Sequence, residues 1–413
     1  MVNNMHENIK DAEKCALFAV NAKQEDLDEL ALLCESAGLT PVGRICANRE
    51  SPHPNSYFGK GKLEELGLYA KAVGATTLIC DDELSARQLK HISKTLNLNV
   101  LDRTLVILDI FAQRANMPEG KAQVELAQLS YSLSRLSGIG VALSRQGGGR
   151  GLGVGARGPG EKKLETDRRH IERRIEKLKA DLRENYSHRK LLRKNRRDPV
   201  IALVGYTNAG KSTLMNALTK ADVYVCDQLF ATLETTARRL ELPTGTRAIL
   251  TDSVGFINKL PHHLIRAFHA TLEELRYASV LIHVIDCSNP NYLEQAQTVE
   301  NVLKSLELLN IPLITAFNKT DLLKKSELSF NRDGSAFISA KTGLGLEDLA
   351  RLCEEKIAQK PTFFIAPYSD GGAISEICKD KILNLRYTET GIEAETYASP
   401  ENIGKYAKYI TNV

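Results

Sequence analysis

The sequence predicts an α/β protein in four parts, and three observations lead to this prediction. Apolar runs alternate with helical patterns both early and late in the chain, as in α/β domains. Two apolar stripes at helical spacing flank a glycine-rich stretch, and a phosphate-binding motif follows a buried apolar run. The expected parts are a small α/β subdomain (1–104), a helical hairpin with a glycine-rich basic loop (105–197), a P-loop α/β domain (198–359) and a small α+β C-terminal domain (360–413).

Composition argues against a membrane-spanning or secreted protein. No stretch approaches the roughly 20 apolar residues that span a bilayer. The N-terminus lacks an apolar run behind a basic one, which argues against a signal peptide. The eight cysteines are scattered without a CxxC pair, so neither a zinc site nor a disulfide framework is indicated. We expect a monomer in the cytoplasm, part of it peripheral to a membrane.

The first part shows alternating strand and helix patterns. Strands are expected at CALFAV, PVGRICA and TTLICD and near residues 100–101, with helices at 25–37, 61–73 and 84–96. This alternation predicts a mostly parallel sheet. Within it, YFGKGKLEEL resembles a glycine-rich turn that opens a helix. Two interpretations stay open: a phosphate docks at this turn, or the glycines only shape a strand-to-helix turn.

The second part contains two helices with apolar stripes. The stripes are Leu126, Leu129, Leu133 and Leu136, and then Leu164, Ile171, Ile175, Leu178 and Leu182 with Arg168 in the same register. They predict an antiparallel hairpin. Ten glycines lie between Gly138 and Gly160, too many for an isolated helix or strand. The loop is either a flexible tip or a basic loop that orders against a partner, with Arg145, Arg150 and Arg157 as its cations.

Positive charge is concentrated in this hairpin. The formal net charge of the chain is +4, but residues 145–197 hold 18 Lys or Arg against 7 Asp or Glu and so carry +11. Such a segment on an otherwise acidic chain favours a nucleic-acid partner. Its only aromatic residue is Tyr186, so backbone and shape recognition of structured RNA is favoured over base stacking. The alternative is a solvated helix face with internal salt bridges.

The third part opens with a phosphate-binding motif. GYTNAGKS, from Gly205 to Ser212, fits GxxxxGK[ST] and lies between the apolar run VIALVG and a helical pattern, which is the context of a P-loop. Backbone N–H groups of such a loop surround the phosphates. We expect Lys211 to place its charge near the β- and γ-phosphates, and Ser212 to bind Mg²⁺ through its hydroxyl.

Two further segments are expected near a γ-phosphate. DSVGF begins at Asp252, which is expected to hold Mg²⁺ through water, while the N–H of Gly255 approaches the phosphate. The segment DQLFATLETT is polar and threonine-rich, of the kind that orders around a γ-phosphate. Thr232 is the predicted second hydroxyl on Mg²⁺, with Thr235 and Thr236 as alternatives.

A base-reading motif follows the apolar run IPLITAF. It is NKTD, from Asn318 to Asp321. Asp321 can accept hydrogen bonds from N1–H and the N2 amino group of guanine, a donor pair that adenine lacks. Asn318 is expected to brace the loop and reach N7, and Ala340 in SAKTG to offer its N–H to O6. The four motifs in this order predict a P-loop GTPase domain.

One residue of the pattern is unusual. Phe256 follows DSVG, where many relatives carry a glutamine that orients the attacking water. Either hydrolysis is lost and the domain only binds nucleotide, or the water is positioned by backbone, another residue or a partner. His262, His263 and His269 lie nearby in the sequence, but nothing singles out one of them as a general base.

Asn208, inside the P-loop, raises a second question. An asparagine here can help to hold a monovalent cation such as K⁺ against the phosphates. It can equally brace the loop through its own hydrogen bonds, so both interpretations stay open.

The motifs together resemble the HflX-type GTPases, of the Obg/HflX-like branch of translation-factor-related P-loop GTPases. The passages that carry the resemblance are LDRTLVILDIFAQRA, EGKAQVELAQLSYSLSRLSG, RGPGEKKLETDRRHIERRI, GYTNAGKSTLMNAL, DQLFATLE and DSVGFINKLPHHL, with YFGKGKLEEL upstream, so it covers essentially the whole chain. Departures are small: Lys162 and Lys163 replace two uncharged residues in the hairpin, and Glu234 stands where an aspartate is common.

The resemblance implies a GTPase that binds GTP, GDP and Mg²⁺ and associates with the large ribosomal subunit and its rRNA. It further implies a role in ribosome splitting, rescue or recycling under stress. Ser212 and Thr232 would hold Mg²⁺, and Lys211, Thr232 and Gly255 would be catalytic. The implied nucleotide site comprises Gly205, Tyr206, Thr207, Asn208, Ala209, Gly210, Lys211, Ser212, Phe230, Ala231, Thr232, Leu233, Glu234, Asp252, Ser253, Val254, Gly255, Asn318, Lys319, Thr320, Asp321, Ser339, Ala340 and Lys341.

Two other functions compete with this one. The hairpin could be an RNA clamp for which the nucleotide is only a structural ligand. A tRNA-modifying GTPase of related fold would require a catalytic cysteine at the C-terminus, and Cys353 and Cys378 are not terminal.

Overall fold

The computed structural model describes residues 13–146, 159–193, 198–219, 229–230, 236–243, 245–259, 264, 273–323, 334–357, 362–397, 402 and 405–411. For residues 136–146, 159–164, 186–193, 362, 381, 397, 407 and 411 only the backbone is described. The expected site residues that lie outside these ranges are Arg150, Arg157, Ala231, Thr232, Leu233, Glu234, Thr235, His262, His263 and His269.

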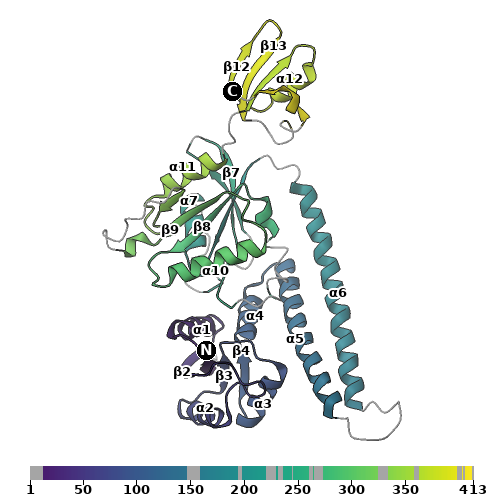
Figure 1. Cartoon of the computed structure of the whole chain (residues 1–413), viewed down its shortest axis with the longest axis vertical. Helices are drawn as coiled ribbons and strands as arrows, with labels where there is room; N and C mark the ends of the chain where they lie inside the picture. Colours follow the sequence, from purple (N-terminus) through teal and green to yellow (C-terminus); the bar gives the residue numbers. More distant parts are fainter. Residues whose placement is uncertain are drawn as a thin grey trace, which may run out of the picture.

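The N-terminal part is a four-stranded parallel sheet in the order β2-β1-β3-β4 (Figure 1). Its strands are β1 (Lys14–Val20), β2 (Thr40–Ala47), β3 (Thr77–Cys80) and β4 (Asn99–Asp102). The helices between them are α1 (Gln24–Ser36), α2 (Lys60–Ala72) and α3 (Ala86–Leu96). Ser85 begins α3 with a capping box to Gln88. The expected alternation of strands and helices is confirmed.

Three helices follow: α4 (Arg103–Arg114), α5 (Pro118–Gln146) and α6 (Pro159–Arg193). The long helices α5 and α6 lie side by side as the expected antiparallel hairpin (Figure 1). The apolar stripes meet between them, with Leu126, Ile175, Leu178 and Leu182 buried. At the rim of this seam Arg174 forms a two-pronged ion pair with Glu125, at 2.6 and 2.7 Å.

A buried polar cluster fixes the hairpin to the N-terminal sheet. Asp102 ends β4 and caps α4 by accepting the N–H of Leu105 at 3.1 Å. The same carboxylate accepts the hydroxyl of Tyr131 at 2.7 and 2.8 Å and pairs with Arg135 at 2.5 Å, and both of these residues lie on α5. A single buried carboxylate therefore joins β4, α4 and α5.

The central domain is a six-stranded sheet in the order β10-β9-β8-β5-β7-β6, parallel except for β6. Its strands are β5 (Val200–Gly205), β6 (Ala237–Glu241), β7 (Arg247–Asp252), β8 (Val280–Asp286), β9 (Leu313–Asn318) and β10 (Ser335–Phe337). Its helices are α7 (Lys211–Thr219), α10 (Tyr292–Ser305) and α11 (Leu346–Ile357), with 3₁₀ turns at Glu273–Tyr277 and Thr320–Leu322. The expected P-loop α/β fold is confirmed.

The C-terminal domain is a small antiparallel sheet in the order β12-β13-β11-β14 with one helix. Its elements are β11 (Thr362–Pro367), α12 (Gly371–Ile377), β12 (Lys381–Tyr387), β13 (Gly391–Tyr397), a 3₁₀ turn (Ala407–Tyr409) and β14 (Ile410–Thr411). After β13, Asn402 and Lys405 are helical, and the N–H of Tyr406 donates to the carbonyl of Asn402 at 2.9 Å. The last described residues then form β14, in which Thr411 and Ile410 pair with Phe363 and Phe364 of β11.

One apolar core joins the N-terminal sheet, the hairpin and the central domain. It contains Leu17 of β1, Ile107 of α4, Val124 of α5 and Val204 of β5. Helix α4 is central to it: Val106, Ile107, Leu108, Ile110 and Phe111 are all at most 1% exposed. Among the residues that the structure describes, no helix combines the length and apolar character needed to cross a membrane.

Candidate nucleotide site

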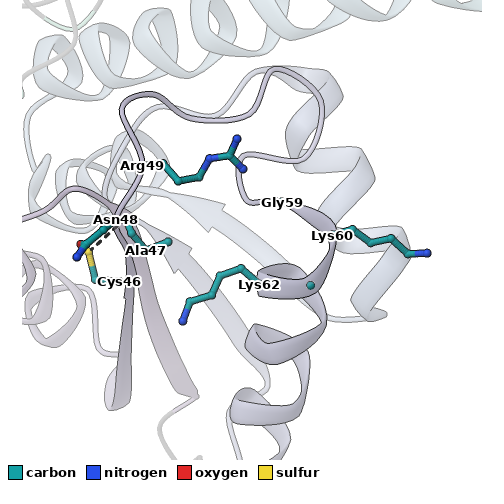
Figure 2. Close-up of a pocket in the computed structure, with 8 residues that line it drawn as sticks. Cys46, Ala47, Asn48, Arg49, Gly59, Lys60 and Lys62 are labelled. Atoms are coloured by element: carbon teal, nitrogen blue, oxygen red, sulfur yellow. Dashed lines mark hydrogen bonds between the residues drawn. The ribbon is translucent and has the colours of Figure 1, made fainter.

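The GKGK turn of the N-terminal part begins α2, with Gly59 as its N-cap. A cavity of about 480 Å³ lies between this turn and the end of β2 (Figure 2), and Arg49, Lys60 and Lys62 give it a cationic lining. Lys62 also pairs with Glu65 at 2.7 Å. The turn is thus a strand-to-helix turn with a cationic cavity beside it, and ligand binding there stays a prediction.

The P-loop joins β5 to α7. Asn208 and Gly210 adopt φ values of +60° and +91°, a left-handed conformation that glycine enters without penalty and asparagine more readily than most residues. A Cβ at position 210 would lie 2.3 Å from Nδ2 of Asn318. Gly210 is therefore required both by its backbone angle and by the close approach of the NKTD loop.

Lys211 begins α7 and is 6% exposed. Its Nζ donates to the carbonyl oxygens of Gly205 at 3.1 Å and Tyr206 at 2.8 Å. Burial lowers the pKa of Lys211 to about 8, although the negative charge of Asp252 acts in the opposite direction. His283 on β8 is 1% exposed, and burial together with the charge of Lys211 lowers its pKa to about 4.

Ser212 and Asp252 meet at the floor of the site. The hydroxyl of Ser212 donates to Oδ2 of Asp252 at 2.7 Å, and Asp252 is 1% exposed. A hydroxyl and a carboxylate are hard oxygen donors, the kind that Mg²⁺ prefers together with phosphate oxygens and water. The hydroxyl of Ser212 and the carboxylate of Asp252 therefore form a donor set that fits Mg²⁺.

The P-loop and the DSVGF segment are joined by two backbone hydrogen bonds. The N–H of Thr207 donates to the carbonyl of Phe256 at 2.7 Å, and the N–H of Phe256 donates to the carbonyl of Gly205 at 3.1 Å. A Cβ at Gly255 would lie 2.9 Å from Cα of Thr207 and 3.1 Å from Nζ of Lys211. The expected contact point for a γ-phosphate therefore lies closely against the P-loop.

Two buried hydroxyls in this region have different surroundings. The hydroxyl of Thr207 has no hydrogen-bond partner within the described ranges, although the residue is only 6% exposed. Such orphaned polar atoms are rare in folded proteins and call for a partner such as a ligand or water. Ser253, by contrast, donates to the carbonyl of Leu203 at 2.6 Å and so supports the segment from β5.

The NKTD loop braces two neighbouring loops. Nδ2 of Asn318 donates to the carbonyl of Ala209 at 2.8 Å, and its Oδ1 accepts the N–H of Ala340 at 2.9 Å. The predicted bracing role of Asn318 is confirmed by these contacts. The same contacts give the N–H of Ala340, expected at guanine O6, a protein partner that the sequence pattern did not indicate.

The expected base-reading carboxylate is held from the SAKTG loop. The hydroxyl of Ser339 donates to Oδ1 of Asp321 at 2.6 Å, which fixes the orientation of the carboxylate. Thr320 donates through its hydroxyl to the carbonyl of Ile338 at 2.9 Å. Lys319, with φ of +66°, pairs with Asp286 at 2.7 Å, and Lys341 is exposed. The fold thus brings the four motifs to one edge of the sheet.

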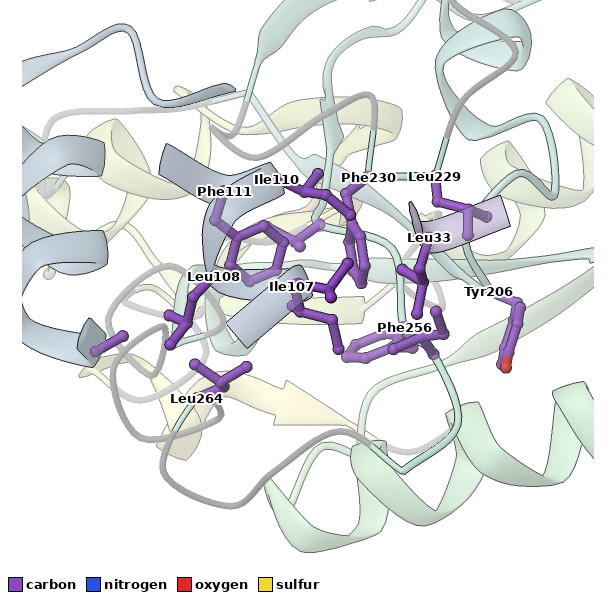
Figure 3. Close-up of a cluster of buried hydrophobic side chains, with 14 of the residues drawn as sticks. Leu33, Ile107, Leu108, Ile110, Phe111, Tyr206, Leu229, Phe230, Phe256 and Leu264 are labelled. Carbon is purple, nitrogen blue, oxygen red and sulfur yellow. The ribbon is translucent and has the colours of Figure 1, made fainter. Parts of the chain in front are cut away.

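Phe230 and Phe256 lie in the shared apolar core (Figure 3). Phe230 is 2% exposed and packs edge-to-face on Phe111 of α4, with ring centroids 4.8 Å apart. Phe256 is also 2% exposed, in the same cluster as Ile107. Thr236 directs its hydroxyl to the sulfur of Met215 at 3.4 Å, which does not support it as the alternative Mg²⁺ ligand; Thr232 lies outside the described residues.

Sequence reasoning missed the N-terminal residues that reach the site. The hydroxyl of Tyr206, in the P-loop, donates to Glu29 of α1 and accepts the N–H of Asn258 at 2.7 Å. Burial and the neighbouring charge of Glu29 raise the pKa of Tyr206. Glu29 and Tyr206 are 177 positions apart, and no local pattern marks either as a partner of the other.

Comparison with known proteins places the chain in a family. Three family models match the chain. The model described as "GTP-binding GTPase N-terminal" matches residues 24–112, and the one described as "GTP-binding GTPase Middle Region" matches residues 114–196. The model described as "50S ribosome-binding GTPase" matches residues 200–319. GTPase HflX of Lacrimispora saccharolytica is 46% identical over 402 residues, which cover 94% of both chains. The chain belongs to the HflX family of GTPases. The resemblance inferred from the motifs is thereby confirmed, and the protein is a GTPase.

Other HflX relatives agree. GTPase HflX of Escherichia coli (strain K12) is 42% identical over 349 residues, covering 83% of this chain and 81% of that protein. Among solved structures, the crystal structure of SsGBP in complex with GDP covers 83% of this chain and 98% of its own, at 26% identity and a TM-score of 0.48. The assignment to the HflX family depends on the sequence matches alone.

Proposed function

We propose that GTP binds at the edge of the central sheet where the four motifs meet. The P-loop from Gly205 to Ser212 would surround the phosphates, Ser212 and Thr232 would hold Mg²⁺, and Asp321 would read guanine. Two features support this placement: the buried hydroxyl of Thr207, which has no partner among the described residues, and the braced loop at Asn318. Bound Mg²⁺ would neutralise charge on the β- and γ-phosphates. Lys211 would leave the carbonyls of Gly205 and Tyr206 to face the phosphates.

The remaining proposed site residues act through the same loops. Lys211, Thr232 and Gly255 would stabilise the γ-phosphate during its transfer to water, and Phe256 leaves that water to backbone or partner groups. The segment Phe230–Glu234 would order around the phosphates. A direct test is substitution of Asp321 by Asn, which should weaken guanine nucleotides and admit xanthine nucleotides, measured with fluorescent analogues. Unchanged base preference would contradict the placement of the base.

We further propose that Asn208 helps to hold a K⁺ ion against the phosphates of the bound nucleotide. The left-handed conformation of Asn208 is equally served by an asparagine that only shapes the loop, so the cation needs its own test. Hydrolysis measured in matched potassium and sodium buffers should be faster in potassium, and Asn208→Gly, which tolerates the same backbone, should remove the difference. Equal rates in both buffers would exclude the cation.

We propose that the protein associates with the large ribosomal subunit in the cytoplasm and acts there as a monomer. The observation that carries this proposal is the match of residues 200–319 to the family described as "50S ribosome-binding GTPase". The +11 charge of residues 145–197 supports contact of the hairpin with rRNA phosphates. The net value of +11 already counts the acidic partners of the exposed intrahelical pairs Arg168–Glu172 and Arg169–Glu165, so this excess remains after these pairs form.

The test is GTP hydrolysis with and without purified large subunits. We expect stimulation that is lost when Gly147–Gly160 is deleted, and retained in Lys379→Ala, which removes an exposed cation of the C-terminal domain instead. If the rate of GTP hydrolysis did not change when large subunits were added, the proposal that the ribosome controls hydrolysis would be wrong. The protein would then bind nucleotide and act on another polyanionic partner.

We propose a role in splitting, rescue or recycling of ribosomes under stress. Incubation of intact ribosomes with the protein and a non-hydrolysable GTP analogue should release separate subunits, resolved by sedimentation. Binding to intact ribosomes without any change in the sedimentation profile would limit the function to association.

A further inference from the structure

The loop that follows Gly255 is held against the P-loop from inside the central domain. Thr207 and Phe256 share one of the two backbone hydrogen bonds described above, and Tyr206 and Phe256 form a parallel bridge. Lys211 faces the carbonyls of this bridge. A γ-phosphate between Lys211 and the N–H of Gly255 would have to separate the two segments, whereas GDP has no phosphate at that position.

The same loop is held from outside by the N-terminal part. Arg103, only 2% exposed, donates to the carbonyl of Asn258 at 3.0 Å, and also pairs with Glu29 and with Asp81, the latter at 2.8 Å. Lys259 pairs with Asp81 and lies 3.3 Å from Asp82. It does so with φ of +53°, a left-handed conformation that is unfavourable for lysine and persists where surrounding contacts hold it.

These contacts lie where parallel sheets usually bind ligands. In the order β2-β1-β3-β4 the connections change direction between β1 and β3, and ligands of such sheets lie beyond the carboxyl ends of the strands at that point. Asp81 follows β3 directly. From the central domain the side chain of Lys259 reaches this carboxylate, which also pairs with Arg103. The loop after Gly255 thus occupies, through Lys259, the position at which such a sheet usually binds a ligand.

We infer that Glu29, Asp81 and Arg103 set the preference of the nucleotide site between GDP and GTP. By holding Tyr206, Asn258 and Lys259, these residues of the N-terminal part stabilise the closed bridge, which GDP tolerates and GTP must open. A ligand shifts a two-state equilibrium only by its different affinity for the two states. Weakening these contacts therefore raises the affinity for GTP relative to GDP. The inference rests on the nucleotide placement proposed above.

The decisive variant is Lys259→Ala. The side chain of Lys259 is 39% exposed, and Asp81 keeps its pair with Arg103, so the fold should tolerate the change. Its matched control is Lys23→Ala. This variant breaks another ion pair between the same two parts, the pair with Glu294, in which the side chains are 65% and 62% exposed. Dissociation constants for GDP and a non-hydrolysable GTP analogue are measured for each protein.

For Lys259→Ala we expect the ratio of the GDP to the GTP-analogue dissociation constant to rise about fivefold or more, the lower range of coupling between sites. Tyr206→Phe, which removes the hydroxyl shared by Glu29 and Asn258, should shift the ratio in the same direction. Lys259→Arg, which keeps the charge, and Lys23→Ala should stay close to the unmodified protein. An unchanged ratio in Lys259→Ala with normal GDP binding would overturn the inference and leave the nucleotide placement intact.

A second measurement uses the unmodified protein. The N–H of Asn258 donates to the hydroxyl of Tyr206, so its hydrogen exchange reports whether the contact is closed. Exchange should be faster with the GTP analogue than with GDP. Equal protection with both nucleotides would contradict the inference, whereas failure of either nucleotide to bind would contradict the proposed site itself.

Discussion

Asn318 and Ala209 lie in loops more than a hundred positions apart, yet the side-chain nitrogen of Asn318 lies 2.8 Å from the carbonyl oxygen of Ala209. The same side chain accepts the N–H of Ala340. One buried amide thus ties the NKTD loop to the P-loop and to the SAKTG loop before any nucleotide binds. The site is largely assembled by the protein alone.

The variant Asn318→Ala should therefore destabilise the protein even without nucleotide. It leaves a buried carbonyl at Ala209 and a buried N–H at Ala340 without their partner, at about 1–3 kcal/mol for each unsatisfied group. Urea unfolding of the nucleotide-free protein measures the loss. If Asn318→Ala lowered only nucleotide affinity and left the unfolding midpoint unchanged, the hydrogen bonds of Asn318 would not contribute to the stability of the protein.

Nucleotide binding should be coupled to protonation of Lys211. Burial lowers the pKa of this lysine to about 8 in the nucleotide-free protein, and phosphates beside it would raise the pKa again. Between pH 8 and the ordinary lysine range the amine is mostly neutral before binding and charged afterwards, so binding takes up a proton. Below pH 8 it is charged in both states.

Calorimetry in buffers of different ionisation enthalpy checks this coupling. Titration of GDP at about pH 8.5 should show uptake of most of one proton, and at about pH 6.5 almost none. Equal uptake at the two pH values would mean that another group carries the proton.

Acid should destabilise the central domain through His283. Burial lowers the folded-state pKa of His283 to about 4 from its ordinary value of 6.5, so the unfolded chain binds the proton more readily between these pH values. Stability therefore falls as the pH falls from 6.5 to 4, by about 3 kcal/mol in total from this group. His283→Leu should flatten that part of the stability profile, measured by urea unfolding at several pH values. A profile of the same slope in His283→Leu would assign the acid sensitivity to other groups.

Restoring a glutamine after DSVG should not accelerate hydrolysis. Phe256 is buried in the apolar core with Phe230, and Phe256→Gln would place an amide there at a cost of about 3 kcal/mol. Phe256→Leu, which keeps the site apolar, should cost less than about 1.5 kcal/mol. Phosphate release and thermal unfolding measure the two effects. Faster hydrolysis by Phe256→Gln at unchanged stability would show that the side chain turns toward the nucleotide instead.

Much of this architecture could be predicted from the sequence because the signals are local. The P-loop needs Gly210 at a left-handed φ and a buried strand before it, and both requirements are visible in the 13 consecutive residues VIALVGYTNAGKS. The stripes of α5 and α6 likewise predicted their shared seam. Helix α4 was less accessible, because seven of its 12 residues are buried and a short apolar run of this kind is compatible with a buried strand as well as a helix.

The contacts between parts could not be predicted in this way. Glu29 on α1 has the pattern of an ordinary exposed helix residue, and its partners Tyr206 and Arg103 are distant in the sequence. Such pairing depends on how two folded units dock, which no periodicity encodes. The N–H of Ala340 was similarly assigned to guanine because its bond to Asn318 exists only in the folded arrangement.

The cluster at Asp102 has a mechanical consequence. Because this carboxylate binds Tyr131 and Arg135 near the middle of α5, the hairpin and the N-terminal sheet must turn together as one arm. Helix α5 has 29 residues and is therefore about 43 Å long. A turn of about 10° around one end of such an arm would carry the other end through about 8 Å, estimated from the helical rise. A rotation of a few degrees at the loop after Gly255 would thus move the glycine-rich end of the hairpin by several ångströms, estimated from the same helical rise.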